Sequence, residues 1–239
     1  MPGAWLILPT YNEAENIGPM VRAAREQLRD GDTILVVDDN SPDGTGAIAD
    51  ELAEEIDGVQ VLHRPGKQGL GRAYLAGFAH ALASGAEYVL EMDSDFSHDP
   101  HDIPRLIHTA EQGADLVLGS RYVPGGSVTD WGLLRKLVSR GGSWYARVVL
   151  GVKVRDLTGG FKCFRRSVLE ALDLNAVHAD GYGFQIELTY RTIKAGFRVV
   201  EIPIVFRDRR VGESKMNARI ALEAVWKVPA LRRRGTANL

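Results

Sequence analysis

The sequence has almost no cysteine and no long apolar run. Its single cysteine, Cys163, excludes an internal disulfide and is typical of a reducing compartment, where we expect it to be a structural thiol. No stretch of about 18 consecutive apolar residues occurs, so no segment is predicted to span a bilayer. The first apolar run follows the N-terminus without a basic leader, which predicts no secretory signal. We therefore expect a cytoplasmic protein.

A charge excess of one sign is also lacking. The 29 lysines and arginines nearly balance 31 aspartates and glutamates, which leaves a net charge of −2. Whole-molecule charge therefore argues neither for nor against nucleic acid. No nucleic-acid partner is among the partners that we predict. With 45% apolar and 25% charged residues over 239 positions, the composition is that of an ordinary globular protein.

Short apolar runs alternate with segments of helical periodicity through the first half of the chain. Strands are predicted at residues 5–8, 33–37, 59–62, 88–92 and 115–118, and helices at 12–28, 45–56, 72–83 and 103–111. Further on, helices are predicted at 168–172 and 184–195, and a strand at 199–206 that Pro203 places at a sheet edge. This alternation predicts an α/β fold with a central, mostly parallel sheet and helices on both faces.

Two acids separated by one serine follow the strand predicted at residues 88–92. Asp93 and Asp95 are at positions i and i+2, so on extended chain both carboxylates point the same way. Carboxylate oxygens suit Mg²⁺ or Mn²⁺, whose remaining ligands are commonly water and substrate phosphates. The alternative is that Asp95 merely caps a turn. Ligands of such sheets bind beyond the carboxyl ends of strands, so residues 9–13, 37–39 and 93–95 are predicted to share one crevice.

Three other phosphate-binding patterns fit poorly. A dinucleotide fold needs G-x-G-x-x-G directly after a strand, but Gly69 and Gly71 have Tyr74 at the third glycine position. No Walker loop is present. A phosphatase with a nucleophilic aspartate normally carries its acid pair near the start of the chain, whereas Asp93 follows four predicted strands.

The combined motifs resemble those of the family 2 glycosyltransferases, and within them the dolichol-phosphate and polyprenol-phosphate mannose synthases. The matching segments, in order, are residues 9–13 (Pro-Thr-Tyr-Asn-Glu), 37–45 (Val-Asp-Asp-Asn-Ser-Pro-Asp-Gly-Thr), 69–71, 93–95, 119–122, and Arg209 with 212–215 (Gly-Glu-Ser-Lys). The resemblance covers nearly the whole chain and implies a Rossmann-like nucleotide-sugar fold of the GT-A type.

The resemblance also implies the roles of particular residues. The nucleoside of GDP-mannose would be held by Pro9, Tyr11, Glu13, Val37, Asp39 and the backbone of Ser94. Asp93 and Asp95 would bind its diphosphate through Mg²⁺ or Mn²⁺, with Ser97 standing where relatives place a glutamine ligand. Arg121, Arg209 and Lys215 would neutralise the phosphates, and Arg135 and Ser139 would bind the phosphate of a dolichyl or polyprenyl acceptor. The catalytic group would be Asp93, Asp95, Arg209 and Lys215.

The implied reaction is an inverting transfer of mannose that yields a β-mannosyl lipid phosphate. Because the acceptor phosphate is already anionic, no general base is required. Gln185 and Glu187 occupy the region where relatives that use hydroxyl acceptors keep an acid, and we expect them to be structural or to orient the sugar. Two alternatives remain open: a polyprenyl-phosphate glucosyltransferase that uses UDP-glucose, and a catalytically silent module that binds nucleotide sugar or lipid phosphate.

Residues 131–155 form a basic amphipathic segment with six cations and no acids, interleaved with apolar residues that include Trp131 and Trp144. It fits a helix lying on a membrane surface, or equally a helix pair whose cations form a solvated face. We expect residues 1–216 to be the catalytic domain, and 217–239 to be an amphipathic helix with a basic tail. The protein would be peripheral on the cytoplasmic face of a membrane, held by these surfaces, by a partner protein, or by a further part of a longer gene product.

Overall fold

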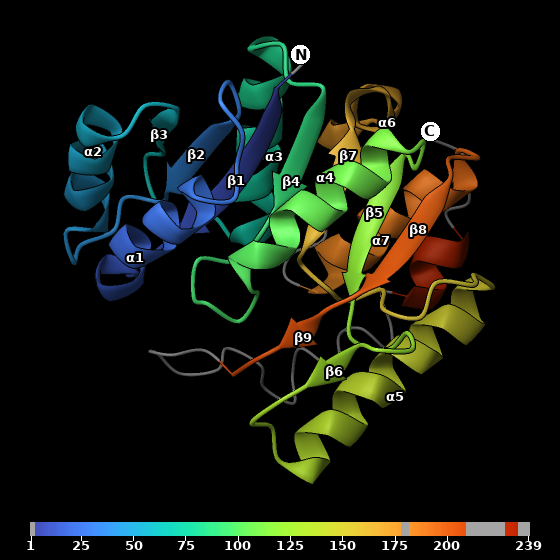
Figure 1. Ribbon diagram of the computed structural model, residues 1–239. Coiled ribbons are helices and arrows are strands. Elements are labelled where there is room, and N and C mark those ends of the chain that lie inside the picture. The colour runs from blue at the N-terminus through green and yellow to red at the C-terminus, as the bar shows by residue number, and fades with distance from the viewer. Residues whose placement is uncertain (1–2, 178–181, 209–227, 234–239) are drawn as a thin grey trace.

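The computed structural model describes residues 3–177, 182–208 and 228–233. Within these residues seven strands form one twisted sheet (Figure 1), in the order β3-β2-β1-β4-β7-β5-β8. The strands are β1 (Ala4–Thr10), β2 (Thr33–Asp38), β3 (Val59–His63), β4 (Tyr88–Glu91), β5 (Leu116–Ser120), β7 (Lys162–Arg165) and β8 (Val199–Pro203). All neighbouring pairs are parallel except those of β7, which runs antiparallel to both β4 and β5. The predicted mostly parallel α/β sheet is confirmed.

The two halves of the sheet were not equally predictable. The predicted strand at residues 199–206 is divided: β8 lies at the sheet edge, as Pro203 indicated, while β9 (Val205–Phe206) leaves it to pair with β6 (Ser127–Val128). No pattern in the sequence predicted β7. This strand has four residues and includes the fully buried Lys162, so it lacks the alternation that marks a strand.

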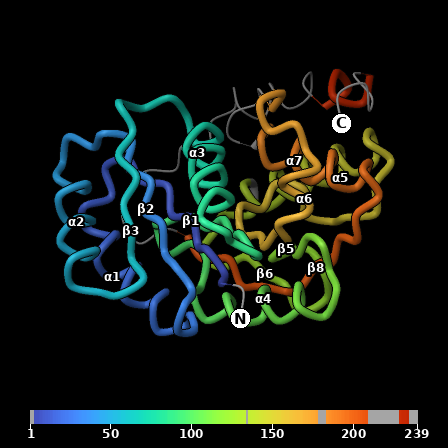
Figure 2. Tube along the Cα trace, turned by 90° about the horizontal axis from the view of Figure 1, so that it is seen from above, coloured from blue at the N-terminus to red at the C-terminus, as the bar shows by residue number. Residues whose placement is uncertain are grey.

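Helices cover both faces of the sheet (Figure 2), with α1 (Ala14–Arg25), α2 (Thr45–Glu55) and α4 (Ile103–Glu111) packed on one face. The other face is covered by α3 (Leu70–Ala83), α5 (Leu133–Leu150), α6 (Arg166–Ala171) and α7 (Tyr182–Lys194). Two short 3₁₀ helices, η1 (Pro100–Asp102) and η2 (Leu174–Ala176), lie in connections.

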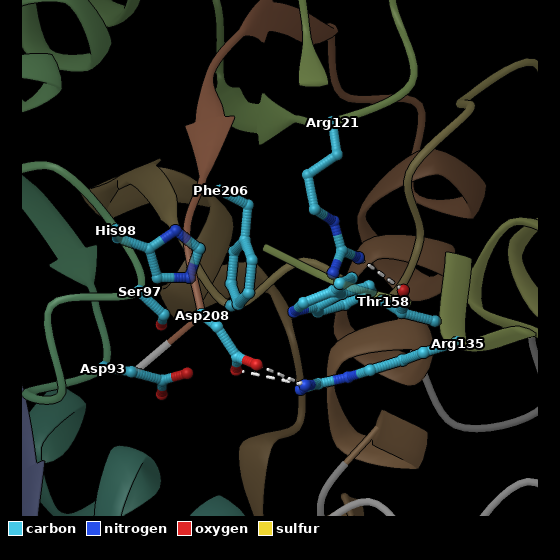
Figure 3. Close-up of a pocket in the computed structure, with 10 residues that line it drawn as sticks. Asp93, Ser97, His98, Arg121, Arg135, Thr158, Phe206 and Asp208 are labelled. Carbon is cyan, nitrogen blue, oxygen red and sulfur yellow. Dashed lines mark hydrogen bonds and ion pairs between the residues drawn. The ribbon is translucent and has the colours of Figure 1, made fainter. Parts of the chain in front are cut away.

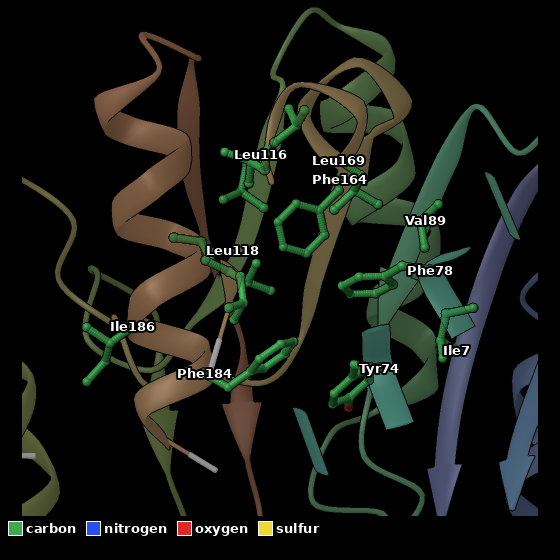
Figure 4. Packing of buried hydrophobic residues seen from close by; sticks show 14 of the residues in the cluster. Ile7, Tyr74, Phe78, Val89, Leu116, Leu118, Phe164, Leu169, Phe184 and Ile186 are labelled. Atoms are coloured by element: carbon green, nitrogen blue, oxygen red, sulfur yellow. The ribbon is translucent and has the colours of Figure 1, made fainter. Parts of the chain in front are cut away.

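Alternation along the strands divides the core into two clusters. Trp5 and Ile7 of β1 belong to the cluster under α3 and α7, whereas Leu6 and Leu8 belong to the cluster under α1 and α4. Figure 4 shows the first cluster, in which Phe78 of α3 meets Phe164 of β7 with 5.7 Å between ring centroids. Because both faces are buried, the open positions of the sheet are at the carboxyl ends of its parallel strands.

The amphipathic helix predicted in residues 217–239 falls mostly outside the described residues, of which 228–233 are helical. Val228 is buried in the cluster under α3 and α7, so this turn packs on the domain. Among the helices that the structure describes, none has the length and apolar character needed to cross a bilayer.

Candidate active site

The carboxyl ends of β1, β2 and β4 meet at one edge of the sheet. Pro9 and Val37 are partners in the β1–β2 register. The Ser94 hydroxyl donates to the carbonyl oxygen of Pro9 at 3.2 Å, and the Asp39 amide donates to the carbonyl oxygen of Thr10 at 3.1 Å. The structure therefore places Pro9, Val37, Asp39 and Ser94, four of the residues predicted to hold a nucleoside, side by side.

The loop after β1 carries the other two predicted nucleoside residues and is tied to the start of α2. The Glu13 amide donates to the Thr45 hydroxyl at 2.9 Å, and the Glu13 carboxylate accepts from Nδ2 of Asn16 at 2.8 Å. The ring of Tyr11 faces Nζ of Lys67, which lies 4.0 Å from the ring centroid. These contacts hold Tyr11 and Glu13 at the same edge as Pro9.

Asp39 is held by partners that the sequence did not reveal. Arg64 forms an ion pair with its carboxylate, and both side chains are at least nine-tenths buried, with 9% and 6% exposed. The amide of Gln68 donates to the second carboxylate oxygen at 3.4 Å. Arg64 directly follows β3, so the rule that parallel strands end at one edge could have placed it here. The pair fixes the direction of the Asp39 carboxylate.

The acid pair lies just beyond β4. Asp93 accepts a hydrogen bond from the Tyr74 hydroxyl at 3.2 Å, and Asp95 accepts one from the Ser97 amide at 3.0 Å. Burial raises the pKa of Tyr74 well above its usual value, and the neighbouring carboxylates of Asp93 and Glu91 raise it further. Tyr74 therefore stays a neutral donor. Asp95 does cap a turn, as the alternative interpretation proposed, and its carboxylate also lies near enough to Tyr74 to raise the pKa of that hydroxyl.

The donor set fits a divalent cation that arrives with its substrate. The described residues contain no group of three or more histidine, cysteine or acidic side chains arranged around a metal position. Mg²⁺ and Mn²⁺ need only one or two carboxylates when phosphates and water complete the shell. Asp93 and Asp95 supply these, and the buried Ser97 hydroxyl has no hydrogen-bond partner in the described part of the chain. A cation held jointly by these residues and a diphosphate fits the site.

A pocket of about 50 Å³ opens beside Asp93 (Figure 3). It is lined by Asp93, Ser97, His98, Arg121, Trp131, Arg135, Thr158, Gly160, Phe206 and Asp208. Four of these are predicted site residues: Asp93, Ser97, Arg121 and Arg135. The pocket therefore joins the predicted metal site to two cations predicted to bind phosphate, although they come from different elements.

Arg121 follows β5 and is held by a buried carboxylate. Its Nε and Nη2 donate to the two carboxylate oxygens of Asp156 at 2.7 Å each, and Nη2 also donates to the Thr158 hydroxyl at 2.8 Å. Burial would raise the pKa of Asp156, but the charge and hydrogen bonds of Arg121 outweigh it and hold that pKa below its usual value. The pair is therefore ionised, and Arg121 is fixed in one orientation at the pocket wall.

The two residues predicted to bind the acceptor phosphate lie on α5. Nη1 of Arg135 is 3.0 Å from both carboxylate oxygens of Asp208, and its guanidinium lies 4.1 Å from the centroid of Trp131. The Ser139 hydroxyl is hydrogen-bonded to the Tyr122 hydroxyl at 2.7 Å. The other predicted phosphate-binding residues, Arg209 and Lys215, lie outside the described residues.

The pocket is lined by aromatic contacts that the sequence did not predict. The His98 ring is buried against Phe161 and Phe206, with centroid distances of 5.1 and 5.0 Å. Burial lowers the pKa of His98 to about 4, so the ring is neutral at physiological pH. Trp131 meets Phe206 at 5.3 Å and is only 6% exposed. The assignment of Trp131 to a membrane-facing apolar set is thus corrected, because its ring is a wall of the pocket.

Gln185 and Glu187 on α7 have different environments. The Glu187 carboxylate accepts hydrogen bonds from Nε and Nη2 of Arg191 at 3.0 and 2.7 Å, so its interaction is with a residue of the same helix. The side-chain oxygen of Gln185 instead accepts from Nζ of Lys162, which also lies 3.1 Å from the Glu91 carboxylate. Burial raises the pKa of Glu91 and lowers that of Lys162, and each partner opposes the shift of the other.

Helix α5 carries an exposed apolar surface. Leu133, Leu137, Val138, Trp144 and Val148 are between 44% and 81% exposed. Ser139, Ser143, Ala146 and Leu150 face inward. The cations Arg140 and Arg147 are exposed beside the apolar residues. Large apolar side chains that are exposed together mark a surface that binds a partner or a membrane, so the membrane interpretation of residues 131–155 stays a prediction.

Comparisons with known proteins concern the family and the fold of the chain. The model of the family "Glycosyl transferase family 2" matches residues 5–173. The chain is 50% identical to polyprenol monophosphomannose synthase of Mycolicibacterium smegmatis, over 93% of this chain and 84% of that protein. It is 48% identical to undecaprenyl-phosphate mannosyltransferase of Micrococcus luteus, over 93% and 90%. A crystal structure of glucosyl-3-phosphoglycerate synthase from Mycobacterium tuberculosis, in complex with Mn²⁺, UDP-glucose and glycerol 3-phosphate, superposes with a TM-score of 0.73 at 20% identity, over 97% of this chain and 80% of that one. This last similarity concerns the fold.

Proposed function

The chain belongs to glycosyl transferase family 2, and we propose that it transfers mannose from GDP-mannose to a polyprenyl monophosphate with inversion at the anomeric carbon. Two relatives that are 48% and 50% identical over 93% of the chain carry names that specify mannosyl transfer to such lipids. The observation that carries the proposal is a single pocket that joins Asp93 of the acid pair to Arg121 and Arg135.

The nucleoside end of the donor is assigned to the edge formed by β1, β2 and β4. Glu13 and Asp39 offer carboxylates there, and carboxylates accept hydrogen bonds from donors of a guanine base and of a ribose. Arg64 holds Asp39 in one direction, which lowers the entropy lost on binding. Tyr11 provides an aromatic face beside them. The base and ribose would lie at this edge, with the diphosphate directed toward Asp93.

Cleavage of the bond between sugar and phosphate leaves a nucleoside diphosphate. A divalent cation, when bound at Asp93 and Asp95, supplies positive charge to that leaving group. Arg121 would add a second positive charge from the opposite wall, and Asp156 keeps its guanidinium in place before the substrate arrives. Preorganised charge of this kind stabilises the transition state without reorganisation during the reaction. We assign the same task to Arg209 and Lys215.

The acceptor phosphate is assigned to Arg135 and Ser139. Its oxygen is anionic at neutral pH and attacks the anomeric carbon without a general base. Gln185 and Glu187 occupy the region where relatives that use hydroxyl acceptors keep an acid. Of these two, Glu187 is bound to Arg191. One in-line displacement would give a β-linked mannosyl phosphate from an α-linked donor.

The acceptor is a lipid, so we propose that α5 docks the enzyme on the cytoplasmic face of a membrane. Leu133, Leu137 and Trp144 provide an exposed apolar surface, and Arg140 and Arg147 provide the charge that anionic headgroups attract. Arg135 lies on the same helix, which brings acceptor binding and docking onto one element. A partner protein, or further chain in a longer gene product, would be the alternative source of anchoring.

A donor screen tests the proposal. Purified protein is incubated with polyprenyl phosphate in detergent micelles, Mg²⁺ or Mn²⁺, and labelled GDP-mannose, UDP-glucose or UDP-N-acetylglucosamine. We expect label in the lipid fraction only with GDP-mannose. Transfer from UDP-glucose instead would identify a glucosyltransferase. Binding of a donor without any transfer would identify a silent binding module.

A further inference from the structure

Lys162 is a lysine without access to water, and its position is set by the sheet. It lies on β7 opposite Glu91 of β4 in the antiparallel register, and both side chains are 0% exposed. Its Nζ lies 3.1 Å from the Glu91 carboxylate and donates at 3.1 Å to the backbone oxygen of Gln185. Burying such a charge is costly unless its partners compensate. The reaction proposed above assigns no role to this ion pair.

The lysine determines which way the Gln185 amide points. An ammonium only donates hydrogen bonds, and Nζ of Lys162 donates to the side-chain oxygen of Gln185. The NH₂ group must therefore be at the other end of the amide. Gln185 is only 3% exposed, and its Nε2 makes no hydrogen bond of good geometry among the residues that the structure describes, although it lies near the Glu91 carboxylate. A buried NH₂ donor that lacks a partner destabilises the protein, so a partner supplied by a ligand would compensate.

The neighbours of Gly160 show where Nε2 of Gln185 lies. A Cβ at Gly160 would lie 3.4 Å from Nε2 of Gln185 and 3.7 Å from Oδ2 of Asp93. The amide and the carboxylate of the acid pair therefore border the same small space beside the glycine. Gly160 and Asp93 both line the pocket, and Gln185 borders it through Gly160. Glu91 also lies close enough for Gln185 to lower its pKa. An NH₂ group carries two hydrogens, so that contact leaves one for a ligand.

The start of α7 is anchored at this point. The Phe184 ring stacks on Tyr74 with 6.0 Å between centroids and 5° between planes, and the Tyr74 hydroxyl binds Asp93 (Figure 4 shows both rings). Gln185 is the next residue in the chain. The backbone of Gln185 is therefore fixed relative to Asp93. A residue that distinguishes one sugar hydroxyl from another must be held in place in this way.

We propose that Nε2 of Gln185 donates a hydrogen bond to one hydroxyl of the hexose in the nucleotide-sugar donor, and that Glu91 and Lys162 are positioning residues that hold the amide in this orientation. The proposal deepens the function above and rests on it, because it requires a nucleotide hexose with its diphosphate at Asp93. Gln185 would thereby contribute to the choice of sugar.

The test compares enzyme variants with donors that each lack one sugar hydroxyl. With whichever nucleotide hexose the wild-type enzyme turns over, kcat/KM is measured for the intact donor and for its 2-, 3-, 4- and 6-deoxy analogues. We expect the wild type to lose about tenfold with one analogue, the value of one neutral hydrogen bond. In Gln185→Met the tenfold difference between the intact donor and that analogue should disappear, because the hydrogen bond to the hydroxyl is no longer made. The affinity for the free nucleoside diphosphate should stay unchanged.

Two further variants separate recognition from folding. Gly160→Ala adds a methyl group at ordinary contact distance from Nε2, so the fold should persist while the hexose space is reduced and the discrimination is lost. Glu91→Gln combined with Lys162→Met removes both buried charges together and frees the amide to turn, so discrimination should fall without an unpaired charge. Thr192→Val is the matched control, because it removes a buried hydroxyl of the same helix that donates to the backbone oxygen of Leu188 at 2.8 Å. It should keep the wild-type pattern.

The outcomes are distinct. If Gln185→Met and Gly160→Ala are folded and keep the wild-type loss with every analogue, Gln185 is structural and the inference is wrong, whatever the donor. If the wild type turns over a hexose other than mannose but the variants lose its discrimination, the proposed mannosyl transfer fails while the role of Gln185 stands. Loss of discrimination in Thr192→Val as well would also overturn the inference, because it would show a general effect of α7.

Discussion

Nη1 of Arg135 lies 3.0 Å from each carboxylate oxygen of Asp208, so an acid of the protein occupies the position proposed for the acceptor phosphate. Arg135 comes from α5 and Asp208 follows β9, which the sheet topology brings to one pocket. An incoming phosphate must displace this carboxylate or share the guanidinium with it. The Asp208 carboxylate therefore competes with the acceptor phosphate for Arg135.

The variant Asp208→Asn tests this competition. The two side chains are 25% and 36% exposed, and pairs exposed to this degree are worth only up to about 1 kcal/mol. We expect KM for polyprenyl phosphate to fall by about twofold to fivefold, with KM for the nucleotide sugar unchanged. Steady-state kinetics with each substrate varied in turn measures both constants. An increase in the acceptor KM would show that Asp208 assists binding.

Removal of the second acid should abolish most of the activity. Asp95→Ala is expected to lower turnover by at least about a hundredfold, as for loss of a group that stabilises charge in the transition state. Excess chelator should have a comparable effect on the wild type, reversed by added Mg²⁺ or Mn²⁺. Asp57→Ala, at an exposed acid outside the pocket, is the control. Full activity in chelator would exclude the cation.

The buried pair of Arg121 and Asp156 should support both stability and acid resistance. Asp156→Asn leaves a guanidinium that is 4% exposed without its counter-charge, which should cost about 3 to 5 kcal/mol of unfolding free energy. The folded state holds the pKa of Asp156 below its unfolded value of about 4, so the unfolded state binds the extra proton. The stabilisation is present above about pH 4 and is lost as pH falls through the folded pKa.

Thermal unfolding from pH 7 to pH 3 measures this effect. The melting temperatures of the wild type and Asp156→Asn should differ most near neutral pH and converge toward pH 3. A difference that is constant over this range would assign the destabilisation to packing and not to the charge of Asp156.

Membrane docking by α5 should depend on its cations and its apolar residues. Changing Lys136, Arg140 and Arg147 to glutamine should weaken sedimentation with anionic liposomes at low salt, since each cation near such a surface contributes on the order of 1 kcal/mol. Changing Leu133, Leu137 and Trp144 to serine should weaken it at high salt as well, because apolar insertion is not screened.

The control for charge alone is the triple change of Arg22, Arg29 and Arg105 to glutamine. It removes three exposed cations, which lie on α1, in the turn after α1 and on α4. This variant should sediment as the wild type does. If it loses binding equally, net charge governs the interaction. If all variants bind normally, another part of the protein holds the membrane.

The first four strands and the nucleoside edge could be predicted because their information is local. Each short apolar run of the N-terminal half became a parallel strand, and the rule that such strands end at one edge placed Pro9, Asp39 and Ser94 together. Even the edge position of β8 followed from Pro203 alone. Periodicity and turn chemistry act within about ten residues, which is the range that a sequence shows directly.

The partners that orient the site could not be predicted because they are distant in sequence. Asp156 is 35 residues from Arg121, and Asp208 is 73 residues from Arg135. Lys162 reads as a surface residue until β7 brings it opposite Glu91. In each case a charge is matched by one that only the tertiary fold brings near, so the sequence indicated which groups act but not what holds them.

The antiparallel strand β7 has a consequence for the order in which the protein folds. Sheet order places β7 between β4 and β5, so the two strands that deliver Asp93 and Arg121 are joined only through a segment that follows both of them in the chain. The strands β3, β2, β1 and β4 form a contiguous block of nearby sequence, whereas β7 must close against β4 over more than seventy residues. Long loops close slowly. The nucleoside edge can therefore assemble early during synthesis, while the acid pair and its facing arginine acquire their final separation only when β7 enters the sheet.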